Sequence, residues 1–229
     1  MSKKAYHYDY DRTIKPHHWH QKNMLWLAKI LLIAKFGTYE YHGVENVPRD
    51  RQFILCANHV DGLDPINLIN GCGSPREAWF MAKKEHFDVK PIRYALYFFN
   101  GFPVDRSRAD LTSIRFALKV CRRGYMFVIF PEGTRDKTRH RPKLENGKSG
   151  AAFFSRECKL PVVPASIHLD PDLSNKHPAS VVRFGKPIEY EEFGFTEGKR
   201  SRKELQNATD LIMTRIQELW DQDTERFAQ

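Results

Sequence analysis

Short apolar runs alternate with amphipathic stretches along most of the chain. The apolar runs predict strands at Tyr39–Val44, Phe53–Ala57, Ala78–Ala82, Tyr125–Phe130, Val162–Ile167 and Ser180–Phe184. Helices are predicted at Pro65–Gly71, Pro91–Phe99, Leu111–Arg123, Gly150–Glu157 and Lys203–Trp220. Of these, Leu111–Arg123 and Lys203–Trp220 have apolar residues at helical spacing. Strands that alternate with helices predict an α/β fold with a mostly parallel central sheet flanked by helices.

The segment Met24–Phe36, before the first strand, predicts a helix that is apolar almost all round. Its thirteen residues are too few to cross a bilayer alone, and Lys29 interrupts the run. The helix fits two roles, packing on the domain or lying in a membrane interface with its lysines toward the head groups. Residues 1–23 are polar and predict a flexible lead-in or a short helix. We therefore divide the chain into residues 1–37, the lead-in and interfacial helix, and 38–229, one domain.

The charge balance limits the possible partners. The 37 Lys and Arg exceed the 28 Asp and Glu, so the net charge is +9. This excess favours nucleic acid, an acidic membrane face, phosphorylated metabolites or an acidic carrier protein. The sequence has no helix-turn-helix, RNP-like or zinc pattern, so we expect no nucleic-acid partner and no metal site. Four cysteines without CxxC spacing, three of them in apolar surroundings, predict reduced thiols in a reducing compartment.

The segment Asn58–Pro65 is the first candidate site. His59 follows the predicted strand Phe53–Ala57, and Asp64 comes five residues later, just before Pro65. Asp-Pro predicts a helix start with Asp64 as the N-cap, from which its carboxylate could reach back to the imidazole. Such a contact fixes the ring tautomer and raises the basicity of the other nitrogen, as a general base requires. The alternative is that Asp64 only caps the helix and His59 is a surface histidine.

The segment Phe130–Arg135 is the second candidate. It directly follows the predicted strand Tyr125–Phe130, and ligands of open α/β sheets bind beyond the carboxyl ends of strands. Gly133 allows the backbone to approach a ligand closely, while Thr134 and Arg135 supply donors suited to phosphate. A charged surface turn with an internal Glu132–Arg135 pair is the alternative.

The segment Asn100–Arg106 is the third candidate, and it closes on an acid and a guanidinium. Arg106 could bind a phosphate with two donors, and Asp105 could hold the guanidinium in place. A solvated salt bridge is the ordinary alternative. The fourth segment, Leu160–Ile167, is an apolar run bounded by prolines and predicts only a core strand.

Together, these segments resemble the motifs of the 1-acylglycerol-3-phosphate acyltransferases, also called lysophosphatidic acid acyltransferases. The resemblance spans about residues 40–190 and rests on motif-like residues in the family's order: Asn58, His59 and Asp64; Asp105 and Arg106; Phe130–Arg135; and the strand around Pro164. Ala82–Glu85 and Gly147–Ala151 are also similar to family segments. One departure is Asp61, where the family usually has a small hydroxyl residue. Asp61 is therefore a possible rival partner for His59.

The resemblance implies a direct transfer from an acyl thioester, acyl-CoA or acyl-ACP, to the free sn-2 hydroxyl of 1-acylglycerol-3-phosphate, giving phosphatidic acid. His59 would be the base and Asp64 its partner, with no metal and no cofactor besides the donor. The residues implied to bind the acceptor are Lys83, Arg106, Glu132, Gly133, Thr134 and Arg135. Because Glu132 is acidic, we expect it to orient an arginine or a glycerol hydroxyl.

The resemblance also implies where the protein works. The acceptor is a membrane lipid, so we expect peripheral association with an anionic membrane at the cytoplasmic face, with Met24–Phe36 in the interface. The basic segment Arg135–Lys143 would contact lipid head groups or the phosphates of a donor such as coenzyme A or acyl carrier protein. The alternatives are an acyltransferase for another lysophospholipid or glycerol-3-phosphate, and a non-catalytic lipid-binding protein.

Overall fold

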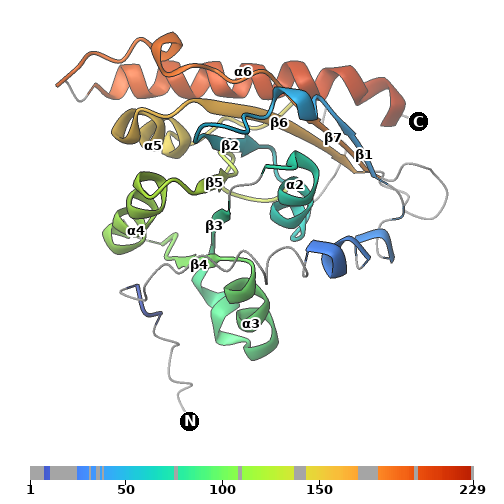
Figure 1. The fold of residues 1–229 in the computed structure, drawn as a ribbon. Helices are drawn as coiled ribbons and strands as arrows, with labels where there is room; N and C mark the ends of the chain where they lie inside the picture. Colours follow the sequence, from blue (N-terminus) through green and yellow to red (C-terminus); the bar gives the residue numbers. More distant parts are fainter. Residues whose placement is uncertain are drawn as a thin grey trace.

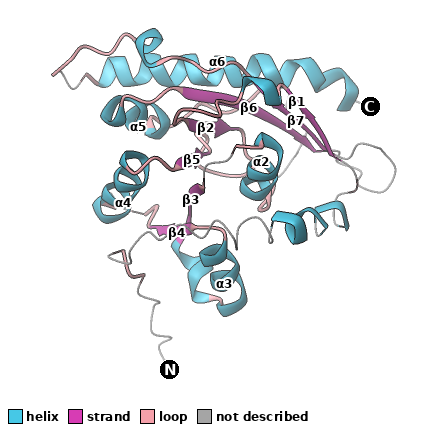
Figure 2. Ribbon diagram, viewed as in Figure 1, coloured by secondary structure: helices cyan, strands magenta, loops and turns pink. Residues whose placement is uncertain are grey.

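A seven-stranded sheet forms the centre of the described part of the chain (Figure 1). The computed structural model describes the following residues of the 229-residue chain: 8–10, 25–30, 32–34, 37, 39–74, 77–107, 110–136, 143–169, 180–198 and 201–227. The strand order is β1-β7-β6-β2-β5-β3-β4. Helices cover both faces, with α4 and α5 on one side and α2 on the other (Figure 2).

The described strands confirm the predicted mostly parallel sheet. Their bounds are β1 Tyr39–His42, β2 Ile54–Ala57, β3 Ala78–Lys83, β4 Gly101–Val104, β5 Met126–Ile129, β6 Val162–Leu169 and β7 Ser180–Phe184. Among these strands, β6 and β7 form the antiparallel pair and the other neighbours pair in parallel. The strand β4 was not predicted, because Gly101 and Pro103 weaken the strand pattern over its four residues. It lies at the sheet edge, where proline is tolerated.

The predicted helices are also present. Their bounds are α2 Asp64–Cys72, α3 Lys90–Phe98, α4 Leu111–Arg122, α5 Gly150–Cys158 and α6 Arg202–Phe227. The chain also forms short 3-10 helices at Val44–Asn46, Lys84–Asp88 and Tyr190–Phe193, which the sequence analysis did not predict. The helix α6 continues past Trp220 because the next turn still contacts the sheet: buried Asp223 binds Arg183 of β7 through two nitrogen–oxygen contacts of 2.9 and 2.8 Å.

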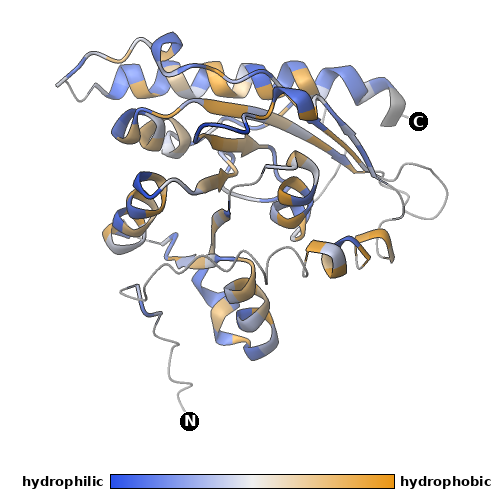
Figure 3. Cartoon of the chain, viewed as in Figure 1, coloured by the Kyte–Doolittle hydropathy of each residue, from blue (hydrophilic) through white to orange (hydrophobic). Residues whose placement is uncertain are grey.

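The core lies along the middle strands β2, β5 and β6, in which every residue is buried. Figure 3 shows the apolar residues concentrated on this part of the sheet. Such continuous apolar runs are typical of parallel strands covered by helices on both faces. Cys56, Cys72 and Cys121 are buried here, in agreement with their apolar surroundings in the sequence.

Part of the predicted N-terminal helix is described. Residues 25–30 and 32–34 are helical, while the other residues of Met24–Phe36 lie outside the described ranges. Ala28 and Leu32 are buried, whereas Trp26 and Ile30 are exposed. One side of this segment therefore packs on the domain and the other faces outward. In the ranges that the structure describes, no helix is both long and apolar enough to span a membrane.

A few residues of the predicted lead-in are also described, and they are ordered against the domain. Tyr8 is buried and stacks on Tyr97 of α3, with ring centroids 5.3 Å apart. The Tyr10 hydroxyl donates to the Pro103 carbonyl over 2.9 Å. The aromatic rings of residues 8–10 thus contact α3, α4 and the β4 edge, within the part of the chain predicted as a flexible lead-in or a short helix. The rest of the lead-in lies outside the described residues.

Candidate active site

The loop after β2 places His59 against Asp64, as predicted. The His59 Nδ1 atom lies 2.7 Å from Asp64 Oδ2. The His59 side chain is 14% exposed and the Asp64 side chain 4%, so the pair is largely removed from water. Because a carboxylate only accepts, Nδ1 carries the proton in this contact and Nε2 of the neutral ring is left as the basic nitrogen. That is the tautomer that a general base at Nε2 requires.

The role of Asp64 in the helix differs from the prediction. Asp64 is the first residue of α2, the cap position falls on Leu63, and no side-chain cap bond is formed. The Asp64 carboxylate instead turns back to the loop, where Oδ2 accepts the backbone N–H groups of Val60 and Asp61 over 2.7 and 2.8 Å. Burial raises the pKa of Asp64, and the hydrogen bonds from His59 and the backbone oppose that rise. The loop itself therefore holds the carboxylate under the imidazole.

Asp61 is placed to shape this loop. Its Oδ1 accepts the backbone N–H of Leu63 over 3.0 Å, and its own N–H donates to Asp64. The contact to His59 Nδ1 thus comes from Asp64, and Asp61 supports the turn between them. Asp64, and not the possible rival Asp61, is therefore the residue that contacts the His59 ring.

The turn after β5 meets the His59 loop directly. The Phe130 ring stacks on the imidazole of His59, with centroids 4.1 Å apart and planes 20° apart. Buried Glu132 accepts the His59 backbone N–H through Oε2 over 3.1 Å and the Glu145 N–H through Oε1 over 3.3 Å. The Asp136 N–H donates to the His59 carbonyl over 2.7 Å. These contacts give Glu132 a positioning role, while its expected contact with the acceptor stays a prediction.

Gly133 meets a backbone requirement in the same turn. Its φ of 71° lies in the left-handed region, and an added Cβ would come within 2.8 Å of Lys148 Nζ. Its carbonyl accepts Arg106 Nη1 over 2.6 Å, which connects this turn to the turn after β4. The neighbouring Thr134 and Arg135 are exposed. The left-handed φ therefore favours glycine here, whereas the flexible end of the Lys148 side chain could move aside for a Cβ.

The pairing expected for Asp105 and Arg106 is not the one formed. Asp105 binds Lys84 Nζ over 2.7 Å and also accepts from Ser107, and these contacts hold the pKa of the Asp105 carboxyl well below its usual range. Arg106 instead donates to Gly133. The prediction failed because Lys84 follows a neighbouring strand and reaches Asp105 across the sheet edge. Burial and the nearby Arg135 lower the pKa of Arg106.

A cavity of about 150 Å³ joins these segments, and it is lined by His59, Lys83, His86, Arg106, Phe130 and Arg135, among others. The structure therefore brings the predicted base together with three of the predicted acceptor-binding cations. Burial lowers the pKa of His86, the charges of Arg135, Lys83 and Arg106 lower it further, and Glu85 opposes this. Such a concentration of donors suits a phosphate monoester.

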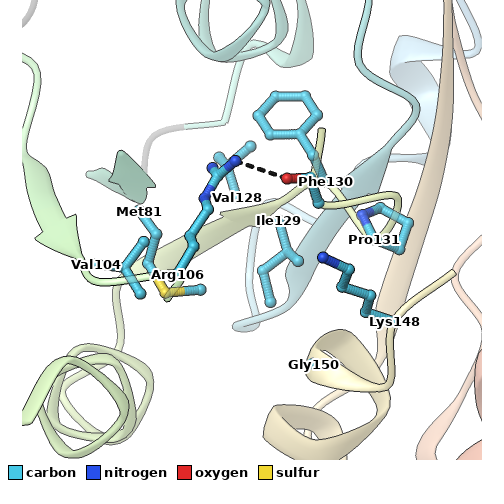
Figure 4. A pocket seen from close by; sticks show the side chains of 10 residues that line it. Met81, Val104, Arg106, Val128, Ile129, Phe130, Pro131, Lys148 and Gly150 are labelled. Carbon is cyan, nitrogen blue, oxygen red and sulfur yellow. Dashed lines mark hydrogen bonds between the residues drawn. The ribbon is translucent and has the colours of Figure 1, made fainter. Parts of the chain in front are cut away.

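Two cavity residues escaped the sequence analysis. His86 lies three residues after Lys83, and its position after a strand whose carboxyl end meets the same edge could have indicated it. Lys148 lines a second cavity of about 200 Å³, together with mainly apolar side chains, including Met81, Val104 and Ile129. Figure 4 shows Arg106 and Lys148 reaching toward the Phe130–Pro131 segment from opposite sides. The two cavities share Met81, Arg106 and Phe130.

The described side chains do not suggest a metal centre. Among the residues that the structure places, no group of three or more His, Cys, Asp or Glu side chains could hold a metal ion. The cavity itself contains the imidazole of His59, paired with Asp64, beside several cations.

Known proteins are similar to this chain in sequence and fold. The acyltransferase family model matches residues 38–168. A 1-acyl-sn-glycerol-3-phosphate acyltransferase of Bacillus subtilis is 32% identical over 195 residues, which cover 83% of this chain and 92% of the relative. One of Streptococcus pneumoniae is 25% identical over 205 residues, covering 88% of this chain and 73% of the relative. The crystal structure of the 1-acyl-sn-glycerophosphate acyltransferase PlsC of Thermotoga maritima has the same fold, with a TM-score of 0.66 and 24% identity over 93% of this chain and 85% of that one. The chain belongs to the acyltransferase family.

Proposed function

We propose that this acyltransferase moves a fatty acyl group from an acyl thioester to the free sn-2 hydroxyl of 1-acylglycerol-3-phosphate, giving phosphatidic acid in phospholipid synthesis. The main support is the His59–Asp64 pair, 2.7 Å apart, in a cavity that is also lined by Lys83, Arg106 and Arg135. The activity named for the relatives from Bacillus subtilis and Streptococcus pneumoniae supports the same acceptor.

In the proposed reaction, His59 is the general base. Its Nε2 accepts the proton of the acceptor hydroxyl while the hydroxyl oxygen forms a bond to the thioester carbonyl carbon. The carbon–sulfur bond then breaks, and the protonated His59 returns the proton to the departing thiolate. Asp64 accepts the Nδ1–H throughout and stabilises the imidazolium, an effect that the low exposure of the pair strengthens.

The cations of the cavity are the proposed acceptor site. A phosphate monoester carries up to two negative charges and three terminal oxygens, whereas a phosphodiester head group carries one charge. Lys83, Arg106 and Arg135 line the cavity that contains His59 and match the monoester better. Gly133 and Thr134 belong to the same turn as Arg135 and would complete this site from the backbone side.

The adjoining apolar cavity offers room for an alkyl chain. Met81, Val104, Val128 and Ile129 line it, and it shares the wall at Phe130 with the catalytic cavity. A lipid with its phosphate among the cations could thus place a chain in apolar surroundings without leaving the site.

The donor, cofactor and location belong to the same proposal. The donor is acyl-CoA or acyl-ACP, and the proposed steps use no metal or cofactor besides it. We infer peripheral association with the cytoplasmic face of an anionic membrane, with the exposed Trp26 and Ile30 of the N-terminal helix in the interface. The net charge of +9 supports attraction to acidic lipids and to an acidic carrier protein.

An acyl-transfer assay tests the proposal. Lysophosphatidate, a lysophospholipid with a phosphodiester head group and glycerol-3-phosphate are each supplied with both donors, and the wild type is compared with His59→Ala. We expect transfer to lysophosphatidate that His59→Ala abolishes, with lipid binding retained. His42→Ala is the matched control, because His42 is a partly exposed histidine paired with Glu40 and should keep full activity. Equal transfer by His59→Ala would remove His59 from the mechanism, and preference for glycerol-3-phosphate would favour that acceptor.

A further inference from the structure

The helix α3 exposes apolar side chains that the fold does not use. Each residue from Lys90 to Phe98, all of them described, is at least partly exposed. Ile92 is 43% exposed and Tyr94 66%, and Val89, just before the helix, is exposed as well. Pro91 and Ala95, which are also exposed, lie between Ile92 and Tyr94 on the outer side of the helix. We call Val89, Pro91, Ile92, Tyr94 and Ala95 the α3 face. Large apolar side chains at such exposure favour a partner that removes them from water.

Charges around the α3 face indicate the kind of partner. The helix itself contains no Asp or Glu. Lys90 and Arg93 lie within the helix itself, and the Arg93 guanidinium lies 5.6 Å from the Tyr94 ring centroid. Apolar side chains bordered by cations are typical of helices that lie in the interface of an anionic bilayer.

The size of the α3 face argues against a protein partner. A stable protein–protein interface needs about 800 Å² and about 20 to 30 residues from each side. The α3 face offers one two-turn helix and the residue before it. A bilayer has no such requirement, because a few inserted side chains add to the attraction between cations and lipid head groups.

The other side of α3 closes the catalytic cavity. Leu96 lines the cavity that contains His59, and Tyr97 stacks on Tyr8 at the inner side of the helix. The helix lies at the β4 edge of the sheet, whereas α6 lies across the other end (Figure 1). A surface that docks through α3 would thus lie next to the wall of the active site.

We propose that the α3 face inserts into the interface of an anionic bilayer, as a docking surface separate from the N-terminal helix. It thereby holds the basic cavity next to the lipid head groups. The transfer of a lysolipid from the bilayer to His59 rests on the proposed function, whereas the docking itself does not.

Vesicle flotation tests the docking. The full chain and the double variant Ile92→Ser/Tyr94→Ser are mixed with vesicles of phosphatidylglycerol and phosphatidylcholine in equal parts. We expect the double variant to bind about tenfold or more weakly, because each substitution removes a large apolar side chain from the interface. Leu111→Ser is the matched control, since Leu111 of α4 is 60% exposed and lies outside the α3 face, so its binding should stay within about twofold. Unchanged binding of the double variant would overturn the proposal.

A second measurement does not depend on removing side chains. Tyr94→Trp places an indole on the α3 face, and lipids brominated on their acyl chains quench a fluorophore that enters the bilayer. We expect more quenching than in the parent chain, which contains four tryptophans of its own. No additional quenching would overturn the insertion. Sedimentation of the wild type completes the test: self-association that the double variant abolishes, with vesicle binding unchanged, would assign the α3 face to a second copy.

An activity measurement separates this proposal from the proposed function. With a short-chain lysophosphatidate dissolved as monomers, we expect Ile92→Ser/Tyr94→Ser to keep the wild-type turnover. With the acceptor presented in vesicles, we expect it to lose most of it. If the wild type transfers no acyl group under either condition, the proposed function fails, while flotation and quenching still decide whether α3 docks.

Discussion

Asp64 lies almost wholly out of solvent, yet its carboxylate must carry a negative charge to serve His59. Burial raises the pKa of this carboxyl even though Oδ2 accepts hydrogen bonds from His59, Val60 and Asp61. The charge is therefore maintained against a desolvation cost, which is a common sign of a site shaped for chemistry. Function and stability should respond differently to its removal.

The variant Asp64→Asn separates the effect on activity from the effect on stability. The amide oxygen can still accept the backbone N–H groups, so we expect the variant to fold with a melting temperature no lower than that of the wild type. Acyl transfer should fall by about 10² to 10⁴ because the neutral amide no longer stabilises the imidazolium. Steady-state kinetics and thermal unfolding measure the two effects. Wild-type turnover in Asp64→Asn would rule out this role for the carboxylate.

Glu132 makes a different kind of contribution, because its two oxygens accept backbone N–H groups of His59 and Glu145. In Glu132→Gln, one of these N–H groups would face an amide NH₂. We expect kcat to fall about tenfold with little change in the KM for the acceptor, and the free energy of unfolding to fall by about 1–3 kcal/mol. Arg135→Lys, by contrast, should raise the acceptor KM. A raised KM with unchanged kcat in Glu132→Gln would place Glu132 in the acceptor site instead.

The helix α6 packs on β6 through the buried side chain of His168. His168 stacks on Trp220 with centroids 3.5 Å apart, and its Nε2–H donates to the Trp220 carbonyl over 2.7 Å. Burial lowers the pKa of His168, and the hydrogen bond to Trp220 partly opposes this. The folded state therefore prefers the neutral ring, whereas the unfolded chain takes up a proton at the ordinary pKa near 6.5.

The neutral His168 ring makes the stability of the fold depend on pH. The stability that the neutral ring contributes is fully present above pH 6.5 and is lost as the pH falls from 6.5 through the lowered pKa, by at most about 1.4 kcal/mol per pH unit. We expect the melting temperature to fall between pH 7.5 and 5.5, and to fall less in His168→Gln, whose amide can still donate to Trp220. Equal pH dependence in both proteins would contradict this assignment.

The sequence predicted the elements that depend on their own residues better than those that depend on contacts with other parts of the chain. The long apolar runs identified β2, β5 and β6, since a strand buried on both faces needs little information from elsewhere. Local signals misjudged Asp64, which reads as a helix cap until the loop before it folds back. The edge strand β4 was missed for a similar reason, because its pairing with β3 outweighs its Gly and Pro.

The site shows the same division. His59, Asp64 and the cations Lys83, Arg106 and Arg135 were found from short motifs, and the cavity brings them together. The contact between His59 and Glu132 joins residues 73 positions apart, and no local pattern encodes it. His86 was overlooked, although its position shortly after β3 places it in the same cavity.

For the whole molecule, parallel strands explain why one cavity can collect so many motifs. His59, Arg106 and Phe130 lie just after β2, β4 and β5, and Lys83 is the last residue of β3. These strands are parallel, so their carboxyl ends meet at one edge of the sheet. The cations of these turns add to an overall charge of +9, which makes association with anionic lipid a property of the entire molecule.

Ionic strength tests this property. Raising the salt concentration from about 0.1 M to about 1 M shortens the screening length from about 10 to about 3 Å. We therefore expect affinity for phosphatidylglycerol vesicles to fall by about tenfold or more, while the weaker binding to phosphatidylcholine vesicles changes little. Flotation at several salt concentrations measures both. Salt-independent binding to the anionic vesicles would show that apolar contacts alone hold the protein.

The pairing of β1 with β7 affects how the chain folds during its synthesis. Tyr39 of β1 pairs with Ser180 of β7. The ribosome therefore synthesises β1 on the order of ten seconds before β7, the strand with which it pairs. Until then the backbone groups of β1 form an open edge that other nascent chains can join. Translation speed through the second half of the message, and the chaperones present meanwhile, should therefore govern the yield of active enzyme.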